Sequence, residues 1–507
     1  MTRNRLTLLL LCSTIAGCQR TSDGARLARA NCSVCHAFPE PALLDKKTWQ
    51  DGVLPQMAVR VGARMATSPR AAFTNPYMIV LPRAVPQADF DKIAAYYRDS
   101  APDKLPNQSL PATPQLDPSF FQVKPMIDRL VSSGIITLLK TDTTRQRIYV
   151  GEAGSNALRV FDFSRRLLSS VTLGSPPTDL IAEKDRLLVL ESGILDPNDE
   201  AKGSLVQYDI VGHDSLRLAR VIIDSLLRPV FLQGYDFAKD GHITYGICEF
   251  GNNRGRLALY RDTAGKYVRQ VLDDTPGAIR FEIRDLTGDG APDIVALFAQ
   301  ADERIVLFEN DGKGNFSGTR RVLARFPPVY GSMYFSMHDF NGDGHPDIVY
   351  VNGDNFDYSR ILKPYHGVRI LENDGHNNFH ERYFFPVYGA ARAEVADFDR
   401  DGDLDILVTS NFADFQGHPE RGIVYLENVG QYQFKPYTFS IAAGNQWNLT
   451  ATADLDKDGW PDILVGAMNL GNIAKRQLGN ARSLESEKDA ILLFENKMGR
   501  RVAGRGR

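Results

Sequence analysis

The feature that most constrains this chain is a pair of short apolar segments that recurs seven times between residues 148 and 494. Successive copies start roughly 40 to 60 residues apart, with Gly- and Asp-rich turns between them. Short strands with such turns are typical of a β-propeller. A four-stranded blade cannot bury both faces by itself, so seven copies predict a closed ring of seven blades. The first segments are residues 148–150, 187–190, 243–247, 294–298, 348–351, 406–408 and 463–465, and the second are 158–161, 205–208, 257–260, 305–308, 368–371, 423–426 and 491–494.

The two ends of this repeat region are expected to meet. Inner repeats continue from the second segment into a fourth strand at residues 315–316, 378–379 and 433–434, whereas the last repeat lacks a good fourth strand after Phe494. Residues 119–123 look like that fourth strand but have no blade ahead of them. We therefore expect this N-terminal strand to complete the seventh blade, which removes two exposed sheet edges.

Four repeats carry an acidic loop directly before the first apolar segment. Oxygen side chains at alternate positions, a glycine at the sharp turn and a closing aspartate suit a hard cation such as Ca²⁺. The seventh position would contribute a backbone carbonyl, from Ala291, His345, Asp403 or Trp460. The predicted side-chain ligands are Asp285, Thr287, Asp289 and Asp293 in the first loop, Asp339, Asn341, Asp343 and Asp347 in the second, Asp397, Asp399, Asp401 and Asp405 in the third, and Asp454, Asp456, Asp458 and Asp462 in the fourth.

This DxDxDGxxD pattern resembles the FG-GAP/VCBS repeats of integrin-alpha-like propellers, and it differs from an EF-hand, which needs a Glu at position twelve. The resemblance implies about four Ca²⁺ ions with a structural role, because in that family the loop ties adjacent strands together. Thr287 stands where a carboxylate or amide is usual, so the first site is expected to be the weakest. The loop at Asp236 and Asp240 keeps two acids and the repeat at Asp179 keeps one, so no metal is expected there.

A second motif lies upstream of the repeats. Cys32, Cys35 and His36 form CxxCH, the spacing of a c-type haem attachment site. Two thiols three positions apart can add to the two haem vinyl groups, and the adjacent histidine then ligates the iron. A zinc site would need a second Cys/His pair nearby, and a thioredoxin-like site would need a preceding strand. The motif therefore predicts one covalent haem c.

The residues that flank the motif resemble a small class I cytochrome c domain, which is all-α. Residues 89–97 place Phe90, Ile93, Ala94 and Tyr97 on one helical face, like the C-terminal helix that packs on the N-terminal one in that family. A methionine as sixth ligand would close the iron to oxygen chemistry and favour electron transfer. The available methionines are Met57, Met65 and Met78; Met57 is preferred, with Met78 as the alternative.

The first residues have the features of a targeting segment. Arg3 and Arg5 precede an apolar stretch at residues 6–15, which Ala16 and Gly17 follow. The next residue, Cys18, makes this end resemble the lipobox of bacterial lipoproteins. The resemblance implies that Cys18 is diacylated and anchors the protein in the cell envelope, with outer-membrane sorting and a periplasmic or surface-facing position expected. The alternative is an ordinary signal peptide with an incidental cysteine.

These observations divide the 507 residues into five parts. Five prolines between residues 102 and 118 predict an extended linker. With 59 basic against 62 acidic residues, the net charge of −3 removes the electrostatic argument for nucleic-acid binding. The predicted parts are a lipoprotein signal peptide at 1–17, a cytochrome c-like domain at 18–100, a Pro-rich linker at 101–118, the propeller at 119–497 and a basic tail at 498–507.

The sequence contains no HExxH, GxSxG or phosphate-binding loop, so no catalytic residues are assigned. Cys248 is expected to be buried and inert. Insertions at residues 353–366, 411–421 and 468–490 would project from the binding face of the ring. The preferred hypothesis is a lipid-anchored cytochrome that transfers single electrons, whose propeller docks a redox partner or an extracellular ligand. The alternatives are a propeller dehydrogenase that passes substrate electrons to the haem, and a ligand-binding or adhesion lipoprotein.

Overall fold

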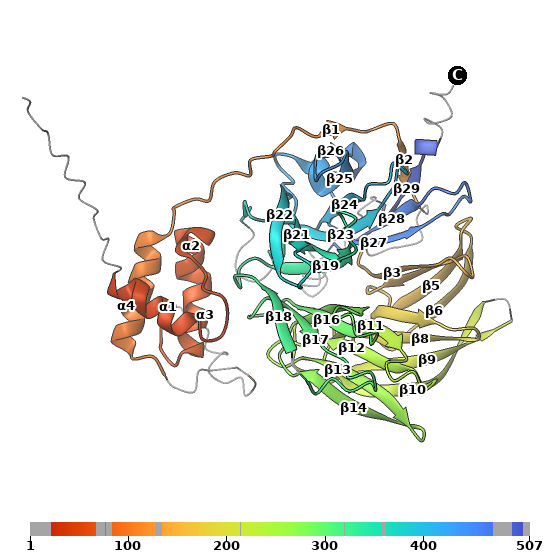
Figure 1. The fold of residues 1–507 in the computed structure, drawn as a ribbon, viewed down its shortest axis with the longest axis horizontal. Coiled ribbons are helices and arrows are strands. Elements are labelled where there is room, and N and C mark those ends of the chain that lie inside the picture. Colours follow the sequence, from red (N-terminus) through yellow and green to blue (C-terminus); the bar gives the residue numbers. More distant parts are fainter. Residues whose placement is uncertain are drawn as a thin grey trace, which may run out of the picture.

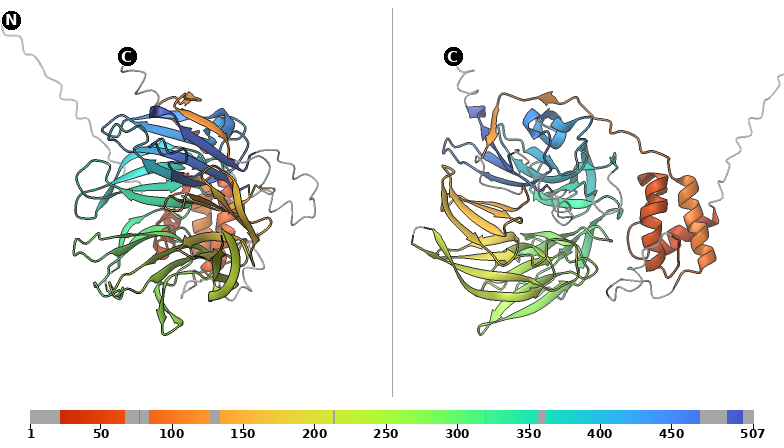
Figure 2. Two further views of the ribbon diagram at one scale, coloured as in Figure 1. Left: turned by 90° about the vertical axis from the view of Figure 1, so that its right-hand side faces the viewer. Right: turned by 180° about the vertical axis from the view of Figure 1, so that it is seen from behind.

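The computed structural model describes residues 22–66, 77, 84–126, 134–212, 214–318, 320–355, 361–469 and 489–499. Within these ranges a small helical domain precedes seven β-sheets, and the helical domain lies at one side of the ring, next to β18 and β22 (Figure 1). The view from behind shows the same side-by-side arrangement (Figure 2). No helix in the described part of the chain is both long and apolar enough to cross a bilayer.

The helical domain is built on the crossing of its first and last helices. The first begins where the Ser22 hydroxyl accepts a hydrogen bond from the Ala25 N–H at 3.2 Å. At Gly24 the two helices approach so closely that a Cβ atom would lie 2.4 Å from the carbonyl oxygen of Lys92. The helices are α1 (Asp23–Cys32), α2 (Lys46–Thr48), α3 (Leu54–Arg60) and α4 (Gln87–Ser100), with further helical turns at Pro41–Leu43 and Trp49–Val53.

The predicted apolar face of α4 is confirmed. Phe90, Ile93 and Tyr97 are buried, and Ala94 packs at the edge of the same cluster. The polar tips of the largest buried rings are satisfied, since Trp49 donates to the carbonyl of Pro41 and Tyr97 to the carbonyl of Pro39, both at 2.8 Å. The helical domain therefore has a buried apolar cluster, which Val329 of the propeller joins.

Seven four-stranded antiparallel blades follow, which confirms the predicted seven-bladed β-propeller. Every predicted first and second segment coincides with a strand, except that Ile243 of the segment 243–247 lies one residue before β12. The blades, in order, are β3 (Ile136–Asp142), β4 (Arg147–Glu152), β5 (Ala157–Asp162) and β6 (Leu167–Thr172); β7 (Pro177–Ala182), β8 (Arg186–Glu191), β9 (Gly203–Val211) and β10 (Ser215–Leu226); β11 (Pro229–Tyr235), β12 (Thr244–Glu249), β13 (Arg256–Thr263) and β14 (Lys266–Asp273); β15 (Ala278–Arg284), β16 (Asp293–Phe298), β17 (Arg304–Phe308) and β18 (Arg320–Arg325); β19 (Ser332–His338), β20 (Asp347–Asn352), β21 (Gly367–Asn373) and β22 (Phe379–Pro386); β23 (Ala390–Ala396), β24 (Asp405–Ser410), β25 (Ile423–Asn428) and β26 (Phe434–Thr438); and β27 (Trp447–Ala453), β28 (Asp462–Ala467), β29 (Ile491–Asn496) and β2 (Phe121–Pro125).

The ring closes as the sequence predicted. Strand β2 pairs antiparallel with β29, so an N-terminal strand completes the seventh blade. The first strand of each blade contacts the first strand of the next, all the way around from β27 to β3, and these strands line the centre. The core consists of seven clusters, each shared by two neighbouring blades. A single blade therefore has no closed core, and the ring is the folding unit.

The fourth strand of blade four differs from the sequence-based expectation. It begins at Arg320 and not at residues 315–316, because Phe316 instead packs edge-on against Phe237 of blade three, with ring centroids 5.1 Å apart. Asp179, the acid that the second repeat keeps, lies inside β7, and its carboxylate pairs with Lys140 at 2.7 Å.

The linker also departs from a free extended chain. Residues Gln115–Leu116 form β1, which pairs in parallel with β26 and adds a fifth strand to blade six. Upstream, the side-chain amide of Gln108 donates to the carbonyl of His366 at 2.9 Å, and the backbone N–H of Gln108 donates to the Tyr388 hydroxyl at 2.8 Å. Parts of the linker are therefore fastened to the propeller surface.

Candidate functional site

A cavity of about 630 Å³ lies between the helical domain and the propeller. Its volume is in the range of pockets that hold cofactors and drug-sized ligands. Four of its wall residues are the predicted haem-binding residues Cys32, Cys35, His36 and Met57. They come from the end of α1, the turn after it and the middle of α3, so the fold brings all four to one space. Met78, the alternative sixth ligand, and Cys18, the predicted lipidation site, lie outside the described residues.

The side chain of His36 is held in a form that suits a metal. Its Nδ1 lies 2.9 Å from the carbonyl oxygen of Ala37, which can only accept, so Nδ1 carries the proton. That tautomer leaves the lone pair on Nε2, the nitrogen available for ligation. Burial lowers the pKa of His36, which favours the neutral imidazole. The charges of Arg325 and Arg60 also lower this pKa, whereas the charge of Asp302 raises it.

Cys32 and Cys35 are not joined by a disulfide, and the environment of Cys32 differs from that of a redox-active thiol. Burial raises the pKa of Cys32 to about 11, with a smaller contribution from Cys35. Reactive CxxC thiols have a lowered pKa, so this environment does not favour a thioredoxin-like role.

The wall that the helical domain contributes is mainly apolar, with Trp49, Val53, Leu54, Phe90 and Ile93 around Met57. Such a surface excludes water and fits the faces of a porphyrin ring. Met65 packs against the same core but is not part of the cavity wall. The residues present therefore fit a haem.

The opposite wall belongs to blades three, four and five of the propeller, and sequence reasoning did not predict it. It is strongly charged, with Arg304 bridging Asp273 and Asp302 at 2.9 Å each and Arg325 pairing with Asp302 at 2.6 Å. No local motif marks these residues, because they reach the cavity only when the helical domain docks on the ring. The charged wall residues are Asp273, Asp302, Glu303, Arg304, Arg320, Arg325, Asp354 and Lys363.

The acidic loops lie at the other end of the blades. In blade four, β15 and β16 are joined by the loop 285–293 at one end, whereas Phe298, at the far end of β16, leads into the cavity wall. A strand of six residues is about 20 Å long, so the predicted calcium sites and the cavity occupy opposite faces of the ring.

The closing aspartate of each loop is buried and accepts hydrogen bonds from more than one segment of its blade. Asp405 accepts hydrogen bonds from the N–H groups of Phe398 and Asn428 and from the Tyr425 hydroxyl, at 3.1, 2.8 and 2.7 Å. The equivalent bonds join Asp293 to Asn310 at 2.9 Å, and Asp347 to Asn373 and Asp462 to Asn496 at 2.8 Å. Each of these asparagines follows a glutamate at or just after the end of the third strand, so the closing carboxylate ties the loop to the third strand of its own blade.

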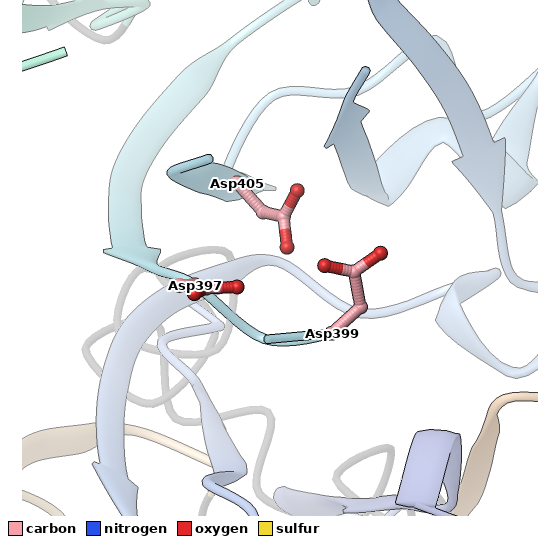
Figure 3. A group of neighbouring side chains, drawn as sticks. All are labelled: Asp397, Asp399 and Asp405. Atoms are coloured by element: carbon pink, nitrogen blue, oxygen red, sulfur yellow. The ribbon is translucent and has the colours of Figure 1, made fainter. Parts of the chain in front are cut away.

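The third loop brings together three carboxylates that could hold a cation. Oxygen atoms of Asp397, Asp399 and Asp405 all lie within 4.8 Å of one another, and Figure 3 shows the Asp399 and Asp405 carboxylates facing each other beside Asp397. Burial and the charge of Asp401 raise the pKa of Asp399 to about 6, and burial raises that of Asp405 to about 7. Carboxylates brought together in this way favour a bound cation.

The fourth loop brings together Asp454, Asp456 and Asp462 in the same manner. Here the amine of Lys497 lies 3.4 Å from Asp456 and contributes one positive charge. In the first and second loops Thr287 and Asn341 occupy the third position, and the glycine turns are kept: Asp285 accepts from Gly290 and Asp339 from Gly344, both at 2.8 Å.

The lone thiol Cys248 is fully buried, as predicted, and burial raises its pKa.

Comparisons with known proteins support the propeller assignment. Residues 285–350, which span the first two acidic loops, match the family described as FG-GAP-like repeat. Integrin alpha-V of Gallus gallus is 25% identical over 224 residues, which are 39% of this chain and 21% of that protein. Integrin alpha-8 of Homo sapiens is 30% identical over 100 residues, 18% of this chain and 9% of that protein. This chain therefore spans about a fifth or less of the length of these relatives.

Among solved structures, Saccharomyces cerevisiae Sqt1 is similar with a TM-score of 0.43 and 9% identity, over 73% of this chain and 97% of that one. The seven sheets together with the integrin alpha and FG-GAP matches define the larger domain as a β-propeller with FG-GAP-like repeats.

Proposed function

We propose that Cys32 and Cys35 bind one haem c through thioether bonds, with His36 and Met57 as the axial ligands. The observation that carries this proposal is that all four residues line a single cavity of about 630 Å³. The Nδ1 hydrogen bond of His36 and the apolar wall around Met57 are what such a cofactor needs. When bound, the haem would supply one-electron redox chemistry, and His36 and Met57 would hold its iron.

From this site we infer a function in electron transfer at the cell envelope, with Cys18 as the lipid anchor. The chain's own residues would orient the cofactor, exclude water from it with the apolar wall of the helical domain, and place charged groups of the propeller in the same cavity. The propeller would dock the redox partner, and about four Ca²⁺ ions would stabilise its acidic loops. The clustering of Asp397, Asp399 and Asp405 supports the calcium part of the proposal.

A second candidate function is the binding of an extracellular ligand by the propeller, as in an adhesion protein. The matches to integrin alpha chains favour it. The two functions are compatible within one chain, since the calcium loops and the cavity lie on opposite faces of the ring.

The test is covalent attachment. The full-length protein, expressed in a host that matures c-type cytochromes, should keep its haem through acid–acetone extraction. The variant Cys32→Ala/Cys35→Ala should lose it, and the matched control Cys248→Ala, which removes a thiol buried in blade three, should keep it. Haem retained by the double variant would refute the assignment.

A further inference from the structure

We propose that the propeller is part of the haem site, and that the Asp302–Arg325 pair of blade four sets the reduction potential of the haem. This inference rests on the proposed function, because it needs a haem in the cavity. It assigns to the propeller a role beyond docking a partner.

The first support is a direct bond between the propeller and the haem-binding motif. The guanidinium of Arg325, at the end of β18, donates a hydrogen bond to the carbonyl oxygen of Cys35 at 3.4 Å. Its Nε pairs with Asp302 at 2.6 Å. Both side chains line the same cavity as Cys35 and His36. The two charges therefore stand beside the segment that would hold the iron.

The second support is that this pair is anchored independently of the helical domain. Arg304 bonds Asp302 on one side and Asp273 on the other, at 2.9 Å each, and its side chain is only 10% exposed. Asp302 is 19% exposed and Arg325 43% exposed, so water screens their charges only partly. If either member is neutralised, Arg304 still holds the remaining carboxylates. The substitutions are thus expected to preserve the fold.

The third step is electrostatic. Reduction adds one electron to the haem, so a nearby positive charge favours the reduced form and a nearby negative charge disfavours it. In the intact pair the two effects oppose each other. Removing one member uncovers the charge of the other, so the two single substitutions must shift the equilibrium in opposite directions.

The experiment compares the reduction potentials of the full-length protein with those of Arg325→Gln and Asp302→Asn. At a fixed ambient potential, Arg325→Gln should lower the ratio of reduced to oxidised haem at least about threefold, and Asp302→Asn should raise it by a similar factor. Threefold corresponds to about 28 mV for one electron, at 59 mV per tenfold change. The control is Arg321→Gln, in the same strand, whose guanidinium donates to the carbonyl of Asn377 at 2.8 Å and does not line the cavity.

The outcomes separate the inference from the proposed function. Opposite shifts of the two variants, with Arg321→Gln unchanged, support the inference. Covalent haem with no shift, or with both shifts in one direction, overturns the inference and leaves the proposed function standing. A wild-type chain without covalent haem overturns both.

Discussion

The hydroxyl of Tyr365 lies 3.0 Å from the carbonyl oxygen of Leu43 and links the loop between β20 and β21 to the helical domain. The same hydroxyl is 3.2 Å from the carbonyl of Val329, a propeller residue that belongs to the helical domain's apolar cluster. The Tyr365 ring stacks on Tyr330 with centroids 4.9 Å apart. The docking of the two domains therefore combines apolar packing with hydrogen bonds from Tyr365 and from Arg325.

Tyr365→Phe should loosen this docking. It removes the donor and keeps the ring stacking, so the expected cost is about 1–2 kcal/mol. Hydrogen exchange should become faster at residues 41–60 and stay unchanged in blade one. The control is Tyr235→Phe, because Tyr235 ends β11 of blade three on the face of the ring away from the cavity. Equal exchange in Tyr365→Phe and the wild type would show that this contact does not hold the domains together.

Met57→Ala should open one axial position of the haem. The reduced variant is expected to bind CO readily, because the sixth ligand is gone. The control is Met65→Ala, since Met65 packs on the same core but does not line the cavity. The readout is the absorption spectrum of the reduced protein before and after CO. If Met57→Ala behaves as the wild type and Met78→Ala binds CO, then Met78 is the ligand.

Calcium removal should destabilise the propeller. Ions that bind only the folded loops add to stability, by about 2.7 kcal/mol per site at a free concentration 100 times the dissociation constant. EDTA should therefore lower the Tm of the propeller and spare the helical domain. Asp399→Ala should bind one ion fewer than the roughly four expected, as measured by elemental analysis, whereas Asp240→Ala in blade three should bind the same number. Equal melting with and without calcium contradicts the proposal.

The buried carboxyl of Glu303 should make stability depend on pH. Burial raises its pKa to about 7, although the carboxylate accepts hydrogen bonds from Gly331 and Ser332. An acid with a raised folded-state pKa binds more protons in the folded state, so stability falls as pH rises from about 4 to about 7 and levels off above that. The full effect is up to about 3 kcal/mol.

Glu303→Gln should flatten this part of the profile. The measurement is Tm at pH 5 and at pH 8 for the variant, the wild type and the control Glu309→Gln, which carries its substitution in the same blade outside the cavity. If Tm falls by the same amount between pH 5 and pH 8 in the variant and in the wild type, Glu303 does not cause the dependence of stability on pH.

The repeat pattern was sufficient to predict the ring. The paired apolar segments are strands because each blade buries them against its neighbours, and β2, which begins at Phe121, pairs with β29 to complete the seventh blade. Local spacing also predicted that Cys32, Cys35, His36 and Met57 act together, and the fold brings all four to one cavity.

The propeller side of the cavity could not be predicted in the same way. Asp302 and Arg325 are separated from Cys35 by more than 260 residues, and only the docking of two domains brings them together. Tertiary contact, and not local pattern, decides such positions.

We propose that this chain carries single electrons on a covalently bound haem. A spectroelectrochemical titration of the full-length protein, monitored at the haem bands after free haem has been extracted, tests this proposal. We expect one reversible transition that follows the Nernst equation for one electron, in a chain whose Cys32 and Cys35 are both modified. A chain that retains no haem, or a haem that shows no one-electron transition, would contradict it.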